Sequence, residues 1–452
     1  MQHSSQPLTD SGVRLPERKH GTVATILSVV FMGLGQVYNS QIKKGLAFAA
    51  IEVVGWLLTP YWIASIRGLM TLGAHGEHLA SVGGIYKMVP GDNSIFLMIQ
   101  GLIALVFLLL ILVLYAVNIA DARTIGWRRD RYLRLGLANQ AVGGQGQYFP
   151  YAVLGIPAIL VFLFSVVPVV FMILLAFTNY SGPNHLPPHA LVNWVGLDTF
   201  RGLFGDPSLA ATFVGVFTWT VVWAVLATLS TFFGGLLVAL LIAQQGIRLK
   251  AMWRTILIVP WAIPSFLSLL IMGNLFNSLG PIDHYLNLIG LPSVPWLTDP
   301  VWAKVSLLLV NMWLGVPVSM AFASGVLTTI PRELYEAAEV DGATMLQRFR
   351  GITLPLFLYA TAPLLILSFV GNFNNFNVIF LFTGGNPAEP RYLTAGSTDI
   401  LITWLYKLTV NFGANSYNLA SAIGVLIFIF VVTLSLINFY RSRSFREEGM
   451  VQ

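Results

Sequence analysis

Long apolar stretches separated by short polar segments dominate the pattern of this chain. The clearest stretch, "SIFLMIQGLIALVFLLLILVLYAVNIA" from Ser94, contains no charged residue. About 20 consecutive apolar residues are enough for a helix to cross the ~30 Å hydrocarbon core of a bilayer. The pattern predicts eight such helices, at 46–66, 94–118, 150–178, 213–243, 255–277, 302–326, 361–383 and 418–440. We therefore expect an all-α, polytopic membrane protein.

A further apolar stretch, 22–38, is shorter than the others and contains Gly33 and Gly35. Glycine weakens a helix because it loses the most backbone entropy on folding. We expect this segment to dip into the membrane or lie along it, although a ninth crossing remains an alternative. The basic residues on both sides of it then share the cytoplasmic face.

Lysine and arginine in short loops predict the orientation of the spans. Basic residues cluster in the loop after 120, in the loop after 243 and in the tail 441–452. We place these segments and the polar N-terminus 1–21 in the cytoplasm. The loops near 67–93, 179–212, 278–301 and 384–417 are mixed in charge, and we place them outside. The net charge of +6 is thus explained by topology rather than by nucleic-acid binding.

The composition and the motifs that the sequence lacks exclude several kinds of functional site. The 452 residues include no cysteine, which excludes disulfides, thiolate metal sites and cysteine nucleophiles. The sequence contains no G-x-x-x-x-G-K-[ST] phosphate loop and no H-E-x-x-H zinc motif. It also lacks the G-x-S-x-G element of many hydrolases. We expect the chain to bind no metal or nucleotide of its own.

One segment, "ELYEAAEVDGATMLQRFRGITLPL" from Glu333 to Leu356, is far more polar than the apolar stretches on both sides of it. Pro331 suits the first turn of a helix, and Glu333 favours the N-terminal end of that helix. Gly342 is expected to end or bend it, and a second short helix can follow from Ala343 to Arg350. Such a pair on the cytoplasmic side fits another protein's groove. An ordinary amphipathic loop is the alternative.

The spacing within this segment resembles the coupling-loop signature of ABC importer permeases. The residues that carry the resemblance are Glu336, Ala337, Ala338, Asp341, Gly342, Ile352, Leu354 and Pro355. In that family the loop, here 329–357, docks into a cleft on a separate ATPase subunit. From about Tyr151 to Arg446 the chain is similar to the larger permease of maltose/maltodextrin-type carbohydrate importers. The resemblance implies a six-helix permease core at 150–440, preceded by accessory helices at 22–149.

This resemblance also implies a function and a set of partners. The chain would be a non-catalytic subunit in a prokaryotic inner membrane that moves a malto-oligosaccharide or related sugar inward by ATP-driven alternating access. Its expected partners are a second permease subunit, two ATPase subunits that carry ATP and Mg²⁺, an extracytoplasmic sugar-binding protein and the lipid bilayer. No nucleic acid is expected.

Polar residues inside the span 361–383 are candidates for sugar contact. Asn372 and Asn375 lie three residues apart, and their amides offer the donors and acceptor that sugar hydroxyls need. The alternative is hydrogen bonding between helices. The resemblance implies a sugar site at Leu314, Gly315, Ser368, Gly371, Asn372 and Asn375. Maltose-binding relatives carry aromatics at the positions of Val318 and Gly371, so the sugar's identity stays open.

The roles of two aromatic residues and three prolines within the spans are also open. Phe373 and Phe376 could stack on sugar rings or simply pack. Pro260, Pro264 and Pro317 each remove a backbone hydrogen bond and permit a kink in a span.

Two rival functions remain. An ion-coupled secondary carrier would need buried acids or cations in its transport core, yet the six core spans contain no Asp or Glu. A membrane-embedded glycosyltransferase would need a constellation of acids, and the outer-loop acids are scattered. Glu52 is the one acid inside a predicted span. A proton-relay role for it is disfavoured because it lies outside the core and has no evident basic partner within the span.

Overall fold

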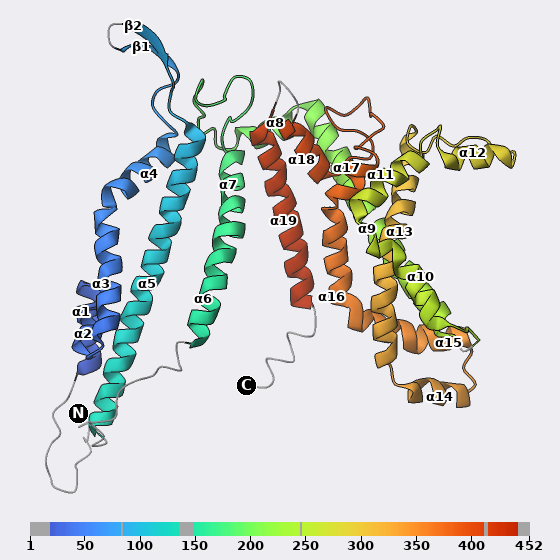
Figure 1. The fold of residues 1–452 in the computed structure, drawn as a ribbon, viewed down its shortest axis with the longest axis horizontal. Helices are drawn as coiled ribbons and strands as arrows, with labels where there is room; N and C mark the ends of the chain where they lie inside the picture. The colour runs from blue at the N-terminus through green and yellow to red at the C-terminus, as the bar shows by residue number, and fades with distance from the viewer. Residues whose placement is uncertain (1–18, 83–84, 135–148, 245, 411–414, 442–452) are drawn as a thin grey trace. The chain divides into compact units, whose positions relative to one another are not determined.

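The computed structural model describes residues 19–82, 85–134, 149–244, 246–410 and 415–441, and these are mostly helical (Figure 1). They form two compact units. Unit 1 comprises Met1–Leu174 and Asn184–Trp194, and unit 2 comprises Leu175–Pro183 and Val195–Gln452.

The described residues contain six helical stretches that are long and apolar enough to cross a membrane. These are Ser94–Asp130, Pro157–Ala176, Pro207–Ala243, Pro300–Thr329, Met345–Phe382 and Tyr417–Ile437. Two further helix pairs pass the same test but are bent, by 54° between α3 and α4 and by 89° between α10 and α11. Counting each bent pair as one span gives eight, at the eight predicted places.

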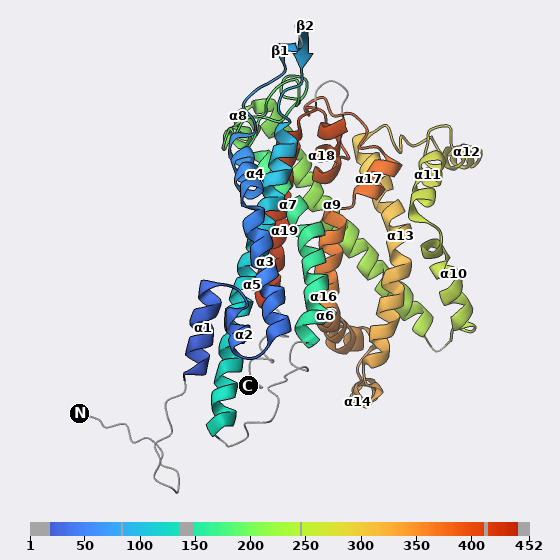
Figure 2. The ribbon, with the colours of Figure 1, turned by 60° about the vertical axis from the view of Figure 1, so that its left-hand side comes forward.

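Unit 1 holds the N-terminal helices and one hairpin. Its elements are α1 (His20–Val30), α2 (Leu34–Tyr38), α3 (Ile42–Leu57), α4 (Thr59–Thr71), β1 (His78–Val82), β2 (Ile85–Val89), α5 (Ser94–Arg134) and α6 (Phe149–Val161), followed by the π-helical turn η1 (Phe162–Val166). Helix α7 (Val167–Ala176) comes next, and the boundary between the units falls within it. Helices α1 and α4 both pack against α5 (Figure 2).

The apolar stretch 22–38 folds as two short helices rather than one span. Helix α1 has 11 residues, about 16 Å at 1.5 Å per residue, roughly half the hydrocarbon thickness. Gly33 breaks the segment with a φ of +93°, and a Cβ there would meet the Gly45 carbonyl oxygen at 2.0 Å. The predicted weakness at this glycine is confirmed.

The predicted outer loop 67–93 contains an antiparallel hairpin of β1 and β2, paired from His78 with Val89 to Val82 with Ile85. At its base, Asp92 Oδ2 accepts hydrogen bonds from the backbone N–H groups of Ala74 (2.7 Å) and His75 (3.1 Å). These bonds hold the pKa of the Asp92 carboxyl below its usual value, because they favour the charged form.

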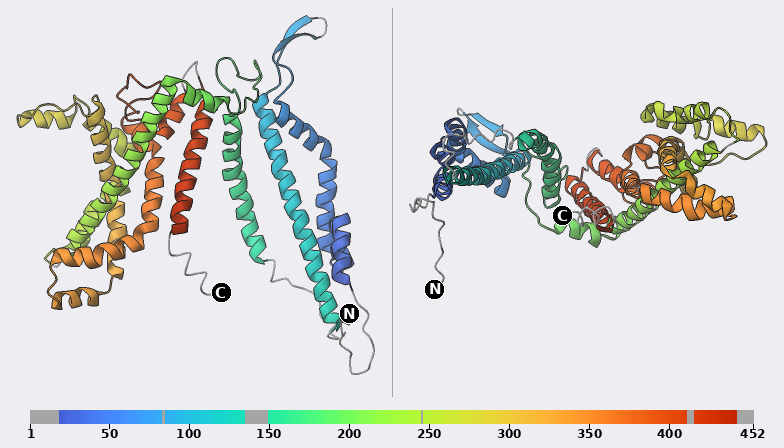
Figure 3. Two further views of the ribbon diagram at one scale, coloured as in Figure 1. Left: turned by 180° about the vertical axis from the view of Figure 1, so that it is seen from behind. Right: turned by 90° about the horizontal axis from the view of Figure 1, so that it is seen from below.

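Unit 2 contains the remaining helices. They are α8 (Asp198–Gly205), α9 (Pro207–Ala243), α10 (Lys250–Ala262), α11 (Ser265–Leu275), α12 (Pro281–Leu288), α13 (Pro300–Thr329), α14 (Arg332–Val340), α15 (Met345–Arg348), the π-helical turn η2 (Phe349–Thr353), α16 (Leu354–Phe373), α17 (Phe376–Phe382), α18 (Leu401–Val410) and α19 (Tyr417–Arg441). Helices α13 and α16 pack against α9. In unit 2, α14 and α15 lie at the end opposite α12 and α18 (Figures 1 and 3).

The three prolines behave differently. Pro264 stands at the 89° break, as the residue before α11. Pro260 lies inside α10 and Pro317 inside α13, and both helices run through them without interruption. The kink permitted at Pro264 is therefore confirmed as a break. At the other two positions the structure shows no interruption of the helix.

Candidate functional site: a capped helix pair and a polar cluster between spans

Helix α14 ends in a tight, fully hydrogen-bonded turn. Asp341 follows its last residue, and Gly342 adopts a left-handed φ of +77°. The N–H of Gly342 donates to the carbonyl of Glu339 (3.0 Å), and that of Ala343 donates to Ala338 (2.8 Å). This pair of bonds is the Schellman arrangement, which satisfies the last carbonyls of a helix. The predicted end of the helix at Gly342 is confirmed.

The second helix, α15, starts with a capping box at Thr344. The Thr344 side chain accepts from the Gln347 N–H, and Gln347 Oε1 accepts from the Thr344 N–H at 2.7 Å. The turn η2 carries the chain from α15 into α16 without a break. The predicted second helix thus exists, and its continuation through η2 is π-helical.

Two side-chain contacts tie the pair into one body. The hydroxyls of Tyr335 in α14 and Thr353 in η2 lie 2.9 Å apart. The Arg348 guanidinium forms an ion pair with Glu339. Behind them, Phe349 and Leu354 pack against the buried cluster that includes Phe357. The helix pair is therefore anchored directly to the base of α16.

The outward surface of the pair is exposed and partly apolar. Val340, Met345 and Leu346 are 88%, 68% and 57% exposed. The coupling residues expected from the sequence divide into two groups. The first group lies in α14 and the turn after it, where Ala338 is half-buried and the exposed residues are Glu336, Ala337, Asp341 and Gly342. The second group lies in η2 and at the start of α16, where Ile352 and Leu354 are half-buried and Pro355 is exposed.

Deeper in unit 2, polar side chains bridge the spans. Asn372 Nδ2 donates to Thr228 Oγ1 of α9 at 3.1 Å, and Trp223 Nε1 donates to the Asn372 carbonyl at 3.0 Å. Asn375 Nδ2 donates to Asn311 Oδ1 of α13 at 3.5 Å. The asparagines therefore make the interhelical hydrogen bonds that the sequence left as an alternative. Sugar contact by the same amides stays a prediction.

The other residues of the expected sugar site differ in burial and in what they contact. Ser368 is half-buried on α16, and a Cβ on Gly371 would meet no heavy atom within 4 Å. Leu314 packs against a buried cluster of α9, α13 and α17. A Cβ on Gly315 would meet Thr231 Cγ2 of α9 at 2.6 Å, so this glycine permits close approach of two helices.

The rings of Phe373 and Phe376 both stack on other phenylalanine rings of the chain. Phe373 is 1% exposed and stacks on Phe430 with ring centroids 5.0 Å apart, so it packs within the protein. Phe376 stacks on Phe380 at 4.8 Å. Val318 lines a groove of about 520 Å³ between α10 and α13 together with Trp261 and Phe322.

Sequence reasoning passed over two residues of α13. Asn311 is 5% exposed and belongs to the polar cluster, and its place inside a span was the available signal. Lys304 places its ammonium 4.6 Å from the centre of the Trp219 ring. It is a cation within the predicted span 302–326, which contains no acid.

The loop after α17 is hydrogen-bonded to the N-terminal half of α9. The backbone N–H of Leu393 donates to Thr212 Oγ1 (2.7 Å), and that of Leu401 donates to Thr220 Oγ1 (3.0 Å). Burial raises the pKa of Tyr392 in this loop, and the nearby Glu389 carboxylate raises it further. The loop is thus hydrogen-bonded to α9 at two points along that helix.

Comparisons with known proteins agree with this arrangement. Residues 232–444 match the family described as "Binding-protein-dependent transport system inner membrane component". The galactooligosaccharides transport system permease protein GanP of Bacillus subtilis (strain 168) is 40% identical, over 95% of this chain and 100% of that protein. The maltodextrin transport system permease protein MdxF of the same organism is 39% identical, over 95% and 97%.

A solved structure shows the same fold. The bacterial ABC transporter involved in import of the acidic polysaccharide alginate matches with a TM-score of 0.55 and 24% identity, over 66% of this chain and 96% of that one. We conclude that this chain belongs to the family of binding-protein-dependent transport system inner membrane components, as a non-catalytic, multi-pass permease subunit of an ABC importer.

Proposed function

We propose that the chain moves a malto-oligosaccharide or a related oligosaccharide into the cytoplasm by ATP-driven alternating access. The observation that carries the proposal is the capped, exposed helix pair α14–α15, joined without a break to α16. The similarity to permeases named for galactooligosaccharides and for maltodextrin supports an oligosaccharide as the substrate. Because the two identities are nearly equal, they do not favour one sugar over the other. Membership of this family argues against the two alternative functions, an ion-coupled carrier and a glycosyltransferase.

The proposal includes separate partners. A second permease subunit completes the pathway, and two ATPase subunits supply ATP and Mg²⁺. A binding protein delivers the sugar from outside, against the loops near 179–212 and 384–417. In support, the related alginate transporter was solved with an oligosaccharide-bound periplasmic protein. The absence of a phosphate-loop motif from this sequence fits nucleotide binding by other chains.

The contacts between α14, α15 and η2 suggest how a movement of the ATPase is transmitted to the proposed sugar site. An ATPase that grips α14 displaces α15 with it, since Tyr335 and Arg348 tie the two helices to each other and to η2. Helix α16 follows directly and has 20 residues, about 30 Å of helix. Asn372 lies near its far end. A tilt of α14 is thereby carried along α16 to the polar cluster.

The test is gentle affinity purification of the tagged chain from native membranes, with mass spectrometry of the proteins that accompany it. We expect a second permease and a phosphate-loop ATPase. The ATPase should be lost from the double variant Glu336→Ala, Gly342→Val and retained by the control Lys87→Ala, which lies on the outer hairpin. Purification of the chain alone, with solute uptake in vesicles that lack ATP, would contradict the proposal.

A further inference from the structure

Unit 1 contains a cavity of about 350 Å³ beside the bend between α3 and α4. At the bend, the Gly55 carbonyl accepts hydrogen bonds from Trp62 Nε1 (3.2 Å) and Thr59 Oγ1 (3.3 Å). The side-chain donors thus satisfy a carbonyl where the helix is interrupted. The bend and the missing Gly55 side chain leave space between this helix pair and α5.

A buried acid, Glu52, opens onto this space. Glu52 is 8% exposed and lines the cavity. Among the described residues, its carboxylate accepts one hydrogen bond, from the backbone N–H of Met32 at the turn between α1 and α2. Lys44, two turns earlier in α3, forms its ion pair with Asp121 at 2.7 Å. The carboxylate therefore keeps unused hydrogen-bonding capacity on its cavity side.

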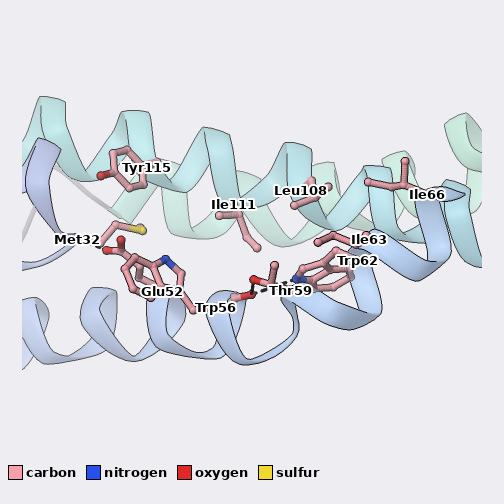
Figure 4. A pocket seen from close by; sticks show the side chains of 11 residues that line it. Met32, Glu52, Trp56, Thr59, Trp62, Ile63, Ile66, Leu108, Ile111 and Tyr115 are labelled. Carbon is pink, nitrogen blue, oxygen red and sulfur yellow. Dashed lines mark hydrogen bonds between the residues drawn. The ribbon is translucent and has the colours of Figure 1, made fainter.

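The two ends of the cavity differ in chemistry (Figure 4). Glu52, Trp56 and Tyr115 lie at one end, whereas Ile63 and Leu108 lie at the other. The Tyr115 hydroxyl donates to the Val29 carbonyl at 2.6 Å, so it contributes its ring rather than its hydroxyl. A carboxylate beside aromatic rings is the combination that favours an ammonium ion.

We propose that this cavity binds a lipophilic ammonium ion that enters from the membrane phase. The ammonium sits on the free side of the Glu52 carboxylate, beside the Trp56 and Tyr115 rings, and the apolar body lies against Ile63 and Leu108. A cation there compensates a charge that is costly to bury alone. The volume lies at the lower end of the ~300–1,000 Å³ found for small-molecule sites. The site lies outside the transport core and is independent of the proposed sugar.

The experiment uses the full chain in nanodiscs of phosphatidylglycerol and phosphatidylcholine. The probes are a diazirine-bearing dodecylamine and its uncharged N-acetyl analogue, with the labelled residues mapped by mass spectrometry. We expect the amine to label residues 52–66 and 104–115, and an excess of plain dodecylamine to suppress the labelling. Glu52→Gln should lower it roughly tenfold, the loss typical of one charge-assisted contact. The glutamine oxygen still accepts from Met32, so the α1–α2 turn is kept.

Two variants control the result. Gly55→Leu fills the cavity, and its Cβ would meet only Ile111 Cδ1, at 3.6 Å, so it should abolish labelling by both probes. Glu77→Gln, in the outer loop, should change nothing. The proposal is overturned if the amine and its acetylated analogue label the wild type equally, or if Glu52→Gln labels as well as the wild type. The cavity would then be a groove for lipid acyl chains only.

Discussion

Two variants can distinguish the two roles considered for Asn372, which are helix packing and sugar contact. It donates to Thr228, and an interhelical bond of this kind contributes about 0.6 kcal/mol in membranes. Thr228→Val removes that partner without altering the asparagine, so we expect uptake to change less than about threefold. If Asn372 contacts sugar, Asn372→Ala should lower uptake by more than about tenfold in the assembled complex.

The same comparison applies to Asn375, with Asn311→Ala as the change that removes its partner. Asn377→Ala, at an exposed position of α17, is the matched control. Radiolabelled sugar uptake, normalised to assembled complex, provides the measurement. Equal losses in Thr228→Val and Asn372→Ala would assign Asn372 to helix packing alone.

Gly342 is required for its backbone conformation rather than for space. Its φ is +77°, yet a Cβ there would meet no heavy atom within 4 Å. A side chain in the left-handed region costs about 1–2 kcal/mol, and asparagine tolerates that region better than other residues. We therefore expect ATPase association and uptake to fall in the order Gly, Asn, Ala, Val. An alanine variant as active as the wild type would contradict this explanation.

At the scale of elements, the tie between α14 and η2 should set how efficiently ATP hydrolysis drives transport. Tyr335→Phe removes the hydroxyl that lies 2.9 Å from Thr353, a bond of about 1 kcal/mol net. We expect the complex to assemble normally but to import less sugar per ATP hydrolysed. The ratio of uptake to phosphate release in proteoliposomes measures this.

A double-mutant cycle provides the control for that prediction. Thr353→Val should give the same loss, and the double variant should lose no more than either single one. Tyr359→Phe, at an exposed position of α16, should leave the ratio unchanged. Additive losses would show that the two hydroxyls act separately.

The elements that the sequence predicted well are those with strong local signals. Gly342 ended α14 as expected, and the eight long apolar stretches all became helices or bent helix pairs. The β1–β2 hairpin was missed, although Gly83-Gly84 between two short apolar runs is a recognised hairpin signal. The partners of Asn372 and Asn375 were not predictable, because they come from α9 and α13, more than 60 residues away.

At the scale of the whole molecule, the topology depends on whether α1 and α2 cross the membrane. If α1 and α2 do not cross the membrane, the N-terminus lies on the same side as Lys43 and Lys44, and eight spans follow. The chain contains no cysteine, so single cysteines can be introduced and labelled with a membrane-impermeant maleimide without background. We expect Glu77→Cys and Asn287→Cys to react in intact cells.

Ser5→Cys, Val340→Cys and Ser444→Cys should react only after the membrane is opened. Val340 is 88% exposed in unit 2, so its protection in intact cells would reflect the membrane or a docked ATPase. Labelling in inside-out vesicles stripped of peripheral proteins separates these two causes. Reaction of Ser5→Cys in intact cells would instead mean that the α1–α2 segment crosses the bilayer, which 11 residues of α1 could do only with the turn at Gly33 opened and α2 aligned with α1.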